Sequence, residues 1–541
     1  MTLQASIEQV LSSSSSYSED PTATARFARS PEGFTRNIRG VVSIGATDDI
    51  QAMLKLANAP ETLASNPFAI FPVSTGNNWG YGTGLPETDD RDAVILDLSA
   101  LSNVTYFDEE DGICSLQPGV TQQRLYEFLQ SKGSDYMVPV TGAGPSCSVL
   151  ANALERGYGI TPGTDHFATV TCIKGYLPTG EFYESSLAAM DQTSDKLVDK
   201  AFKWKHGPYL DGLFTQSGNM VVTEVTLVLE KPKDGFDSFY MRFYKPDSFA
   251  DAYLTVKSIF QSLGAVVGSI NLMDRRRVAA MVSENPQGPG THQNMTDEQL
   301  DDIAKRHQVP HWTVVGTIYA PKSVSRAARK EIAALAAGRA DEVLFSSGIK
   351  IKFGQWLVKH LPFSFLTPVK EQLEKLEMGM QIMKGIPNQI ALPLAYWRNP
   401  RVRPDGQRAL NPAEDGCGIL WYAPLVPAKV PQMELFIAMV RRICATYNIE
   451  PMVTFTNFSA HCTDSTIPIV FDRENPAAVA DAQTCLNKLF EEGIKNGFVP
   501  YRMNIEQQQQ IDKAAPFWKA AKQINTSLDS NNILSPGRYD L

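Results

Sequence analysis

A glycine-rich segment that follows an apolar, strand-like run constrains the fold more than any other part of this sequence. It reads Pro72-Val-Ser-Thr-Gly-Asn-Asn-Trp-Gly-Tyr-Gly-Thr-Gly84. Glycine tolerates positive φ and lets the backbone approach a ligand closely, so that successive amide groups can form a concave site for an anion. Taken alone, such a segment is more often an ordinary turn after a strand, and a loop that cradles a pyrophosphate is the functional alternative.

The composition favours a folded protein that binds a small molecule. The chain has 541 residues, of which 43% are hydrophobic, so it can bury at least two substantial cores. Its formal net charge is −9, and it has no sustained Lys/Arg block. These features argue against nucleic acid or an anionic membrane surface as the main partner.

Cysteine spacing and the N-terminal residues bear on the compartment. The seven cysteines are widely spaced without a Cys-x-x-Cys pair, which gives no zinc or disulfide signature. The N-terminal residues are polar, and no apolar run is long enough to span a bilayer. We therefore expect a soluble, cytoplasmic protein.

His307 and His311 are four residues apart, but Pro310 intervenes, so no metal site is predicted.

From residue 39 to residue 232, short strand-like runs alternate with helical patterns, which predicts a mixed domain of helices and strands. Thr47 or Asp48 is the expected N-cap of the first helix, and Gly133 the expected end of the second. A hairpin is expected to turn at Pro178-Thr-Gly180. We expect strands at 40–44, 93–98, 113–117 and 220–229, and helices at 48–57 and 121–132.

A second alternation of strand-like runs and helical patterns begins after residue 232. It predicts helices that cover one face of an antiparallel sheet. Gly493 is the expected end of the last helix. The apolar segment 353–383 is either an active-site cap or, by preference, a packed core or dimer contact. We expect strands at 238–243, 265–273, 311–320 and 418–424, helices at 248–263, from 323, at 431–447 and at 476–492, and a hairpin at 452–471.

Several motifs carry a more specific resemblance. After the glycine-rich segment come Pro118-Gly-Val120 and Val149-Leu-Ala-Asn-Ala-Leu-Glu-Arg-Gly-Tyr-Gly159, and then Thr161-Pro162 and Asp165-His166. In order and spacing these motifs resemble the vanillyl-alcohol oxidase and 4-cresol dehydrogenase flavoprotein family, and the likeness spans nearly the whole chain. Later segments that extend it are His206-Gly-Pro-Tyr-Leu-Asp-Gly-Leu-Phe214, Tyr501-Arg502 and Asn532-Ile-Leu-Ser-Pro-Gly-Arg538.

The resemblance implies an α+β protein whose cofactor is FAD. Residues 1–38 would be an N-terminal extension, 39–232 an FAD-binding domain of the PCMH type, 233–500 a substrate or cap domain, and 501–541 a C-terminal segment that returns to the flavin site. The residues expected to contact FAD are Val73, Ser74, Thr75, Gly76, Asn77, Asn78, Tyr81, Pro139, Gly142, Gly144, Cys147, Ser148, Asn152, Gly157, Gly159, Ile160, Val222 and Arg538.

The resemblance also implies a reaction. In that family a para-substituted phenol binds as phenolate, passes a hydride from its benzylic carbon to flavin N5, and leaves a quinone methide. Tyr81, Tyr501 and Arg502 match catalytic positions that hold the phenolate. An arginine charge does not titrate away, and each tyrosine offers an O–H donor on a rigid ring. The implied partners are a small aromatic substrate, O2 or another electron acceptor, and a second copy in a homodimer.

Three positions depart from the family pattern. Ile160 stands where a third phenolate-binding tyrosine is common, and Val140 stands where an acidic residue supports hydride transfer. Ile419 aligns near the histidine that carries flavin covalently in the oxidase branch, so that linkage cannot form here. Cys147 and Tyr396 remain candidates for a covalent link, while noncovalent FAD is at least as well supported.

The departures leave other functions open. The protein could be a divergent flavin oxidase of a natural-product intermediate that is not a phenolate, or a flavin scaffold that has lost turnover. His461, in the expected C-terminal hairpin, is a candidate base, although a satisfied or exposed histidine is the more frequent case. His166 is expected to be structural rather than a proton shuttle.

Overall fold

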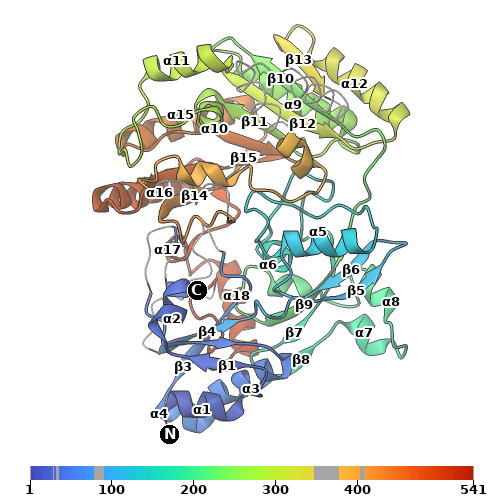
Figure 1. Cartoon of the computed structure of the whole chain (residues 1–541), viewed down its shortest axis with the longest axis vertical. Helices are drawn as coiled ribbons and strands as arrows, with labels where there is room; N and C mark the ends of the chain where they lie inside the picture. The colour runs from blue at the N-terminus through green and yellow to red at the C-terminus, as the bar shows by residue number, and fades with distance from the viewer. Residues whose placement is uncertain are drawn as a thin grey trace.

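The chain forms a lower part that holds the N-terminal residues and an upper part built on one large sheet, and the C-terminal segment returns to the lower part (Figure 1). Both helices and antiparallel sheets are present, so the predicted α+β class is confirmed. The computed structural model describes residues 2–28, 30–31, 36–77, 91–346, 377–401 and 408–539.

A four-stranded sheet lies near the N-terminus. Three of its strands are parallel, and the first strand of the chain joins them antiparallel. Helices α1 (Leu3–Val10) and α3 (Thr47–Asn58) pack together over its buried side chains. The predicted strands and the first predicted helix agree with these elements to within about one residue. Across the sheet the order is β1 (Ser16–Ser18), β2 (Gly40–Ser43), β4 (Asp92–Asp97) and β3 (Phe68–Val73).

Helix α3 begins one residue earlier than the sequence predicts. Its N-cap is Ala46 and no side chain caps its first amides, so the prediction of Thr47 or Asp48 as N-cap is wrong. The acidic residues of the first turn do not cap the helix. Instead, the Asp49 carboxylate accepts hydrogen bonds from the backbone amide and the hydroxyl of Ser12. These bonds tie the N-terminal residues to the helix.

A five-stranded antiparallel sheet completes the lower part. Helices α5 (Gln122–Ser131) and α6 (Val149–Leu154) share its apolar core. Gly133 follows α5 with a φ of +67°, as the sequence predicts, whereas Thr121, expected as the first helical residue, is the N-cap. Gly180 turns the predicted hairpin with a φ of +85°. The strand order is β5 (Val104–Asp108), β6 (Ile113–Leu116), β9 (Val221–Val228), β7 (Val170–Tyr176) and β8 (Phe182–Tyr183).

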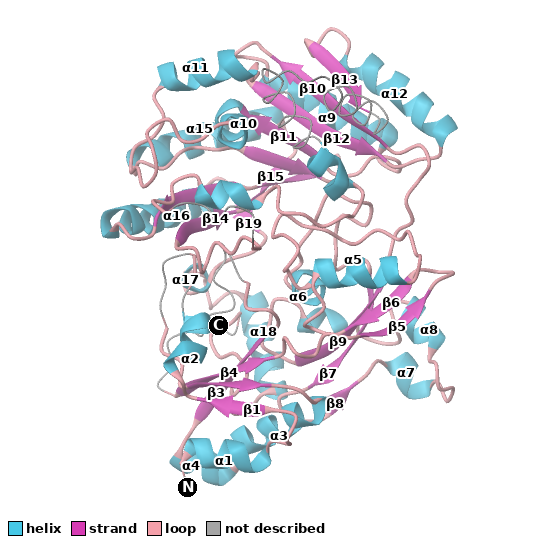
Figure 2. Cartoon of the chain, in the orientation of Figure 1, coloured by secondary structure: helices cyan, strands magenta, loops and turns pink. Residues whose placement is uncertain are grey.

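An eight-stranded sheet, antiparallel at every pairing, forms the upper part (Figure 2). Helices α9 (Phe249–Leu263), α12 (Lys322–Ala336) and α15 (Val430–Thr446) pack into one core with it, which confirms the predicted helix-covered sheet. Its strand order is β13 (Glu342–Ser346), β10 (Asp237–Phe243), β12 (Trp312–Ile318), β11 (Ile270–Asp274), β16 (Thr454–Asn457), β17 (Cys462–Ser465), β15 (Pro424–Pro427) and β19 (Val499–Pro500).

Two predicted elements of the upper part divide between sheets. The expected strand at 418–424 ends at Tyr422, and Pro424 begins β15 in the large sheet, because proline lacks the amide that would continue the first ladder. The expected hairpin at 452–471 is three strands, and the third, β18 (Ile467–Asp472), pairs with β14 (Cys417–Tyr422) in a separate two-stranded sheet.

Among the remaining helices, α16 (Pro476–Lys495) packs against β14 and β18. Residues 377–383 are helical, and Ile382 joins the core of the five-stranded sheet, whereas the rest of the predicted apolar segment up to residue 376 lies outside the described residues. Further elements are α2 (Pro21–Ala28), α4 (Pro60–Ser65), α7 (Ser186–Met190), α8 (Leu197–Ala201), η1 (Asp211–Phe214), α10 (Arg275–Val282), α11 (Asp297–His307), η3 (Leu392–Tyr396), α16 (Pro476–Lys495), α17 (Ile505–Gln508) and α18 (Pro516–Leu528).

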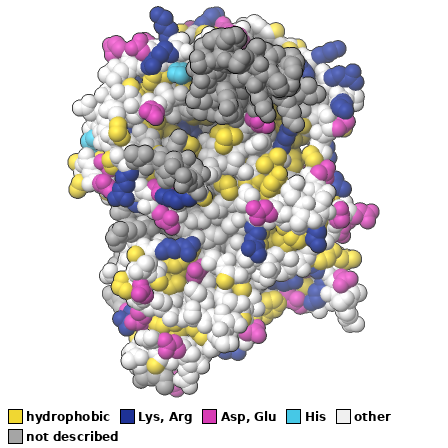
Figure 3. Space-filling view, in the orientation of Figure 1, with side chains coloured by type: hydrophobic (Ala, Val, Ile, Leu, Met, Phe, Trp, Pro, Cys, Tyr) yellow, Lys and Arg dark blue, Asp and Glu magenta, His cyan; other side chains and the backbone are white. Residues whose placement is uncertain are grey.

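The surface carries mixed charge. On the face seen in Figure 3, basic and acidic side chains are interspersed around apolar ones. Within the described ranges, the helices are all too short or too polar to cross a membrane.

Gly493 does not end helix α16, contrary to the sequence prediction. The helix continues to Lys495, and Gly493 is buried inside it. A Cβ at this position would overlap the hydroxyl oxygen of Tyr422 on β14. The glycine is therefore explained by close packing against a tyrosine rather than by helix termination.

We expect Gly493→Ala to lower stability, although alanine is the better helix former by about 1 kcal/mol. The forced movement of Tyr422 should cost about 1–3 kcal/mol, measured as a lower midpoint of thermal unfolding. Adding Tyr422→Phe removes the obstructing oxygen and should restore most of the loss. Equal destabilisation with and without Tyr422→Phe would contradict the packing explanation.

Candidate functional site

The predicted site residues lie where loops of the lower part meet the eight-stranded sheet. The hydroxyl of Ser269 donates to the carbonyl oxygen of Gly159 at 3.3 Å. The hydroxyl of Tyr319 lies 3.3 Å from the carbonyl oxygen of Ile160 and 2.5 Å from that of Met383. The segment after α6 is therefore held between the two parts of the chain.

Two glycine-containing loops approach one another beside this segment. The side-chain amide of Asn77 donates to the carbonyl of Ser146 at 3.1 Å, which joins the loop after β3 to the loop before α6. Gly76 has a φ of +69° and Gly144 a φ of +87°. A Cβ at Gly144 would lie 2.9 Å from Leu392, so both the backbone conformation and the space there require glycine.

The start of α6 is fixed by Ser148. Its hydroxyl donates to the carbonyl of Pro118 at 2.6 Å and accepts the amide of Ala151 at 3.1 Å as the N-cap. One turn later, the side-chain amide of Asn152 lies 2.5 Å from Nδ1 of His166. These bonds connect three of the motifs on which the family resemblance rests.

His166 is buried and uncharged. Burial lowers its pKa to about 4. Because an amide nitrogen donates, Nδ1 of the ring accepts from Asn152 and Nε2 carries the proton. Within the described residues Nε2 has no hydrogen-bond partner, and it would lie 3.0 Å from a Cβ placed on Gly159. This arrangement leaves a buried donor directly beneath the glycine segment.

Tyr501 and Arg502 follow strand β19 and reach the end of α6. Arg502 donates from Nε and Nη2 to the carbonyl oxygen of Glu155, at 3.0 and 2.7 Å. Its guanidinium carbon lies 5.5 Å from the centre of the Tyr501 ring. The Tyr501 ring is in turn 5.1 Å from that of Tyr158, which is 5.3 Å from Phe458. A permanent positive charge and an aromatic cluster thus occupy the same place.

Asp464 is a buried acid that our sequence analysis missed. On β17 its neighbour Thr463 bonds toward helix α9 through Tyr253, so strand alternation directs Asp464 to the opposite face of the sheet. Its Oδ2 accepts the hydroxyl of Thr466 at 2.9 Å. The signal in the sequence was an acidic residue within an otherwise uncharged, alternating strand.

The pKa of Asp464 is raised to about 7, mainly because the carboxyl is buried. The hydroxyls of Tyr158 and Thr466 and the charge of Arg502 limit the rise. His461, the base considered from the sequence, is exposed on the same hairpin instead. Asp464, rather than His461, therefore faces the aromatic cluster.

The two candidate sites of covalent flavin attachment differ in their surroundings. The Tyr396 hydroxyl donates to Asp415 at 2.5 Å inside an apolar cluster, and burial together with this bond raises its pKa. Cys147 lies in the loop before α6, and burial raises the pKa of its thiol. Neither group is held as an ionised nucleophile.

The departures from the family pattern also have defined places. Val140 is fully buried in the core of the five-stranded sheet, and Ile160 packs against that core. Ile419 is buried in β14, within the same cluster as Tyr396.

The predicted FAD-binding residues fall on a few segments of the lower part and its C-terminal return, and their contacts with FAD remain predictions. Val222 lies in the core of the five-stranded sheet, and Arg538 forms an ion pair with Glu155. Asn78 and Tyr81 lie outside the described residues. The others are Val73, Ser74, Thr75, Gly76 and Asn77 at the end of β3, Pro139, Gly142, Gly144, Cys147 and Ser148 before α6, and Asn152, Gly157, Gly159 and Ile160 in and after α6.

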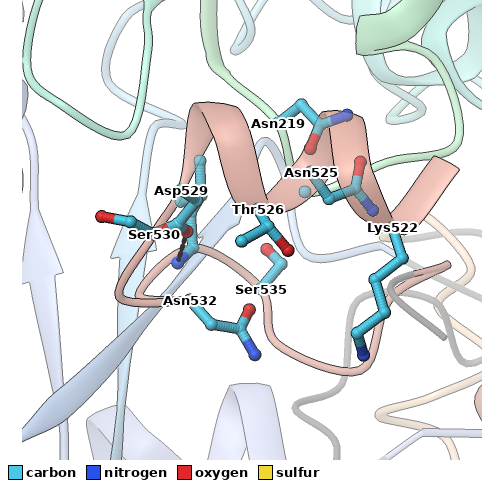
Figure 4. A pocket seen from close by; sticks show the side chains of 10 residues that line it. Asn219, Lys522, Asn525, Thr526, Asp529, Ser530, Asn532 and Ser535 are labelled. Carbon is cyan, nitrogen blue, oxygen red and sulfur yellow. Dashed lines mark hydrogen bonds between the residues drawn. The ribbon is translucent and has the colours of Figure 1, made fainter. Parts of the chain in front are cut away.

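A small pocket beside α18 is separate from the aromatic cluster. It has a volume of about 120 Å³ and is bordered by polar side chains of α18 and of the turn that follows, among them Lys522, Asn525 and Asp529 (Figure 4). Tyr501, Arg502 and Asp464 do not line it. We therefore do not assign the candidate site to this pocket.

The residues present fit FAD. The glycine loops supply backbone that approaches closely, as a pyrophosphate requires. Buried polar atoms without partners in the described part of the chain, including Nε2 of His166, Oγ1 of Thr161 and Nε of Arg538, surround the same segment. Such atoms are expected where a polar cofactor completes the hydrogen bonding.

Comparison with known proteins agrees with this assignment. Residues 38–186 match the family model of the FAD binding domain. A 1'-carboxy-chondrochloren decarboxylase from Chondromyces crocatus is 27% identical over 530 residues, which cover 97% of this chain and 94% of that protein. The flavoprotein subunit of 4-cresol dehydrogenase (hydroxylating) from Pseudomonas putida is 23% identical over 504 residues, 92% of this chain and 87% of that protein.

A solved structure shares the fold over nearly the whole of both chains. The crystal structure of p-cresol methylhydroxylase with substrate bound matches with a TM-score of 0.83 at 22% identity, over 99% of this chain and 96% of that one. The fold class and the FAD cofactor predicted from the sequence are thereby confirmed, and the resemblance to this group of flavoproteins is supported. The matched FAD binding domain, the likeness to 4-cresol dehydrogenase and the shared fold support an FAD-dependent oxidoreductase of the p-cresol methylhydroxylase (PCMH) type.

Proposed function

We propose that this protein oxidises a small para-substituted phenol or related aromatic alcohol at its benzylic carbon. The observation that carries the proposal is the contact of Arg502 with Tyr501 and, through it, with Tyr158, beneath the sheet that bears Asp464. Bound FAD would supply the hydride acceptor at flavin N5. In this proposal residues 39–232 hold FAD and residues 233–500 cover the substrate.

The roles of the chain's own residues follow from their chemistry. Arg502 would stabilise the negative phenol oxygen, because its charge persists at any working pH. Tyr501 and Tyr81 would donate hydrogen bonds to the same oxygen. The rings of Tyr158 and Phe458 would enclose the aromatic substrate and exclude water. O2 or another acceptor would reoxidise the cofactor, and a homodimer is the proposed assembly.

A second candidate function is oxidation coupled to loss of a carboxyl group from a natural-product intermediate. It is favoured by the likeness to a protein described as a decarboxylase, which extends over 97% of this chain. A substrate carboxylate could pair with Arg502 as a phenolate would. The presence of Val140 and Ile160 in place of the family's acidic residue and third tyrosine is compatible with such a substrate. A flavin scaffold without turnover is the remaining alternative.

An anaerobic titration of the holoenzyme tests these functions. Addition of a 4-alkylphenol should bleach the flavin absorbance without release of CO2 if the first proposal holds. Bleaching only by a carboxylated aromatic substrate, with CO2 formed in equal amount, would favour the second candidate. An unchanged spectrum with both classes would contradict turnover altogether.

Arg502→Lys should weaken binding of the phenol by about 10–100-fold, because a lysine cannot keep both bonds to Glu155 while facing the substrate. The dissociation constant can be taken from the spectral change of the flavin. Arg156→Lys is a matched control, since Arg156 is bonded to the hydroxyl of Thr215. Equal weakening in both variants would argue against a specific role for Arg502.

We expect acid precipitation to release the flavin into the supernatant. The Tyr396 hydroxyl is committed to Asp415, and the Cys147 thiol has a raised pKa, so neither side chain is prepared to attach the cofactor. The measurement is the absorbance of pellet and supernatant. A yellow pellet would contradict the expectation, and Cys147→Ala and Tyr396→Phe would then identify the linkage.

A further inference from the structure

Asp464 occupies an unusual position for a carboxyl group. Its side chain is fully buried, and it faces away from the helices that cover the large sheet. The bond from Thr466 satisfies Oδ2. Oδ1 makes no hydrogen bond of normal geometry in the described part of the chain, although the Tyr158 hydroxyl is near enough to lower the pKa of the carboxyl. A buried carboxyl with an open oxygen is costly unless it has a function or a ligand.

The neighbours of Asp464 connect it to the proposed substrate site. Tyr158 lies between Asp464 and Tyr501, because its hydroxyl interacts with the carboxyl while its ring lies 5.1 Å from the Tyr501 ring. Arg502, whose guanidinium carbon lies 5.5 Å from the centre of the Tyr501 ring, acts electrostatically on the same carboxyl. The carboxyl of Asp464, the hydroxyl of Tyr158 and the guanidinium of Arg502 thus lie together beside Tyr501.

We propose that Asp464 is the proton acceptor of this site and receives the proton of the bound phenol through the Tyr158 hydroxyl. The inference rests on the proposed oxidation of a phenol. In this step the O–H bond of the phenol breaks and its proton passes to the Tyr158 oxygen, while the Tyr158 proton passes to Asp464. The phenol oxygen keeps the electron pair as a phenolate beside Arg502, and no electrons leave the substrate in this step.

The charges around Asp464 determine the pH dependence. Within the described residues, the titratable or charged groups that face it are Tyr158 after α6, Arg502 after β19 and Cys462 on its own strand. Its cross-strand partners on β15 and β16, Leu425 and Thr456, are uncharged.

The sign of the pH effect follows from the pKa of about 7. Above that pH the carboxylate is ionised in the free protein and can accept a proton. Below it the carboxyl is already protonated, so the proton of the phenol must go to solvent.

Proton release on ligand binding tests the proposal without turnover. The probe is 4-chlorophenol, which has no benzylic carbon to oxidise, bound to the holoenzyme between pH 5.5 and 8.5. Calorimetry in buffers of different ionisation heat counts the released protons, and the ultraviolet band of the bound probe reports phenolate. The native protein should release about one proton below pH 7 and close to none above it.

Asp464→Asn should release about one proton at every pH in this range, because an amide cannot accept it. Tyr158→Phe should give the same result by removing the connecting hydroxyl, and it tests the proposal independently if the first variant folds poorly. Thr466→Val is the matched control. It keeps the carboxyl, so the step should persist and move to higher pH as one stabilising bond is lost.

The outcomes separate this proposal from the proposed function. A phenolate band with one proton released at every pH in the native protein would overturn the role of Asp464 and leave phenol oxidation standing. Absence of a phenolate band in the native protein would overturn phenolate binding itself, and the role of Asp464 with it. A pH step that persists in both Asp464→Asn and Tyr158→Phe would also overturn the proton acceptor assignment.

Discussion

The candidate site depends on one residue at the end of helix α6. The backbone carbonyl of Glu155 accepts two bonds from Arg502, and its carboxylate pairs with Arg538. The last carbonyl groups of a helix lack intrahelical partners and carry partial negative charge, so a cation is favoured there. Because Arg502 lies 347 positions later in the chain, this single helix end holds the C-terminal segment against the lower part.

Backbone hydrogen bonds also hold the C-terminal segment against the lower part. Residues 533–535 form strand-like hydrogen bonds to Ile70 on β3, with Ile70 donating to Ile533 at 2.8 Å and Ser535 donating to Ile70 at 2.8 Å. Gln216 donates to the carbonyls of both Glu155 and Tyr501. The position of Tyr501 is therefore set by polar contacts from several segments, as a site that must hold an aromatic ring in one orientation requires.

One face of the eight-stranded sheet is covered by helices and the other faces the lower part, and alternate residues of each strand point to these two faces. Thr463 faces the helices and bonds to Asn457, while the next residue, Asp464, faces the lower part. A shift of one residue in the register of β17 would exchange these two side chains. The strand pairings that fix the register, Leu425 with Asp464 and Thr456 with Asp464, therefore also determine which group reaches the site.

Much of the fold could be predicted because periodicity is local. Helix α5, strand β9 and the helix-covered sheet follow from patterns within a few residues. The change of sheet at Pro424 could not be predicted, because it depends on pairing with strands distant in the sequence. The continuation of α16 through Gly493 could not be predicted either, because it depends on packing against the Tyr422 hydroxyl. Motif spacing pointed to Arg502, but the importance of Asp464 arises only from burial and from neighbours distant in sequence.

The packing around Val140 differs from the packing around Asp464. Val140 has no exposed surface in the core of the five-stranded sheet, so a carboxylate there would be buried without a charge partner. Ile160 packs against that core and carries no hydroxyl. On β17 of the large sheet, Asp464 is buried but has Thr466, Tyr158 and the charge of Arg502 near it. In this protein the buried acid of the candidate site therefore lies on the covering sheet, where a tyrosine and an arginine are near it, and not at the position of Val140.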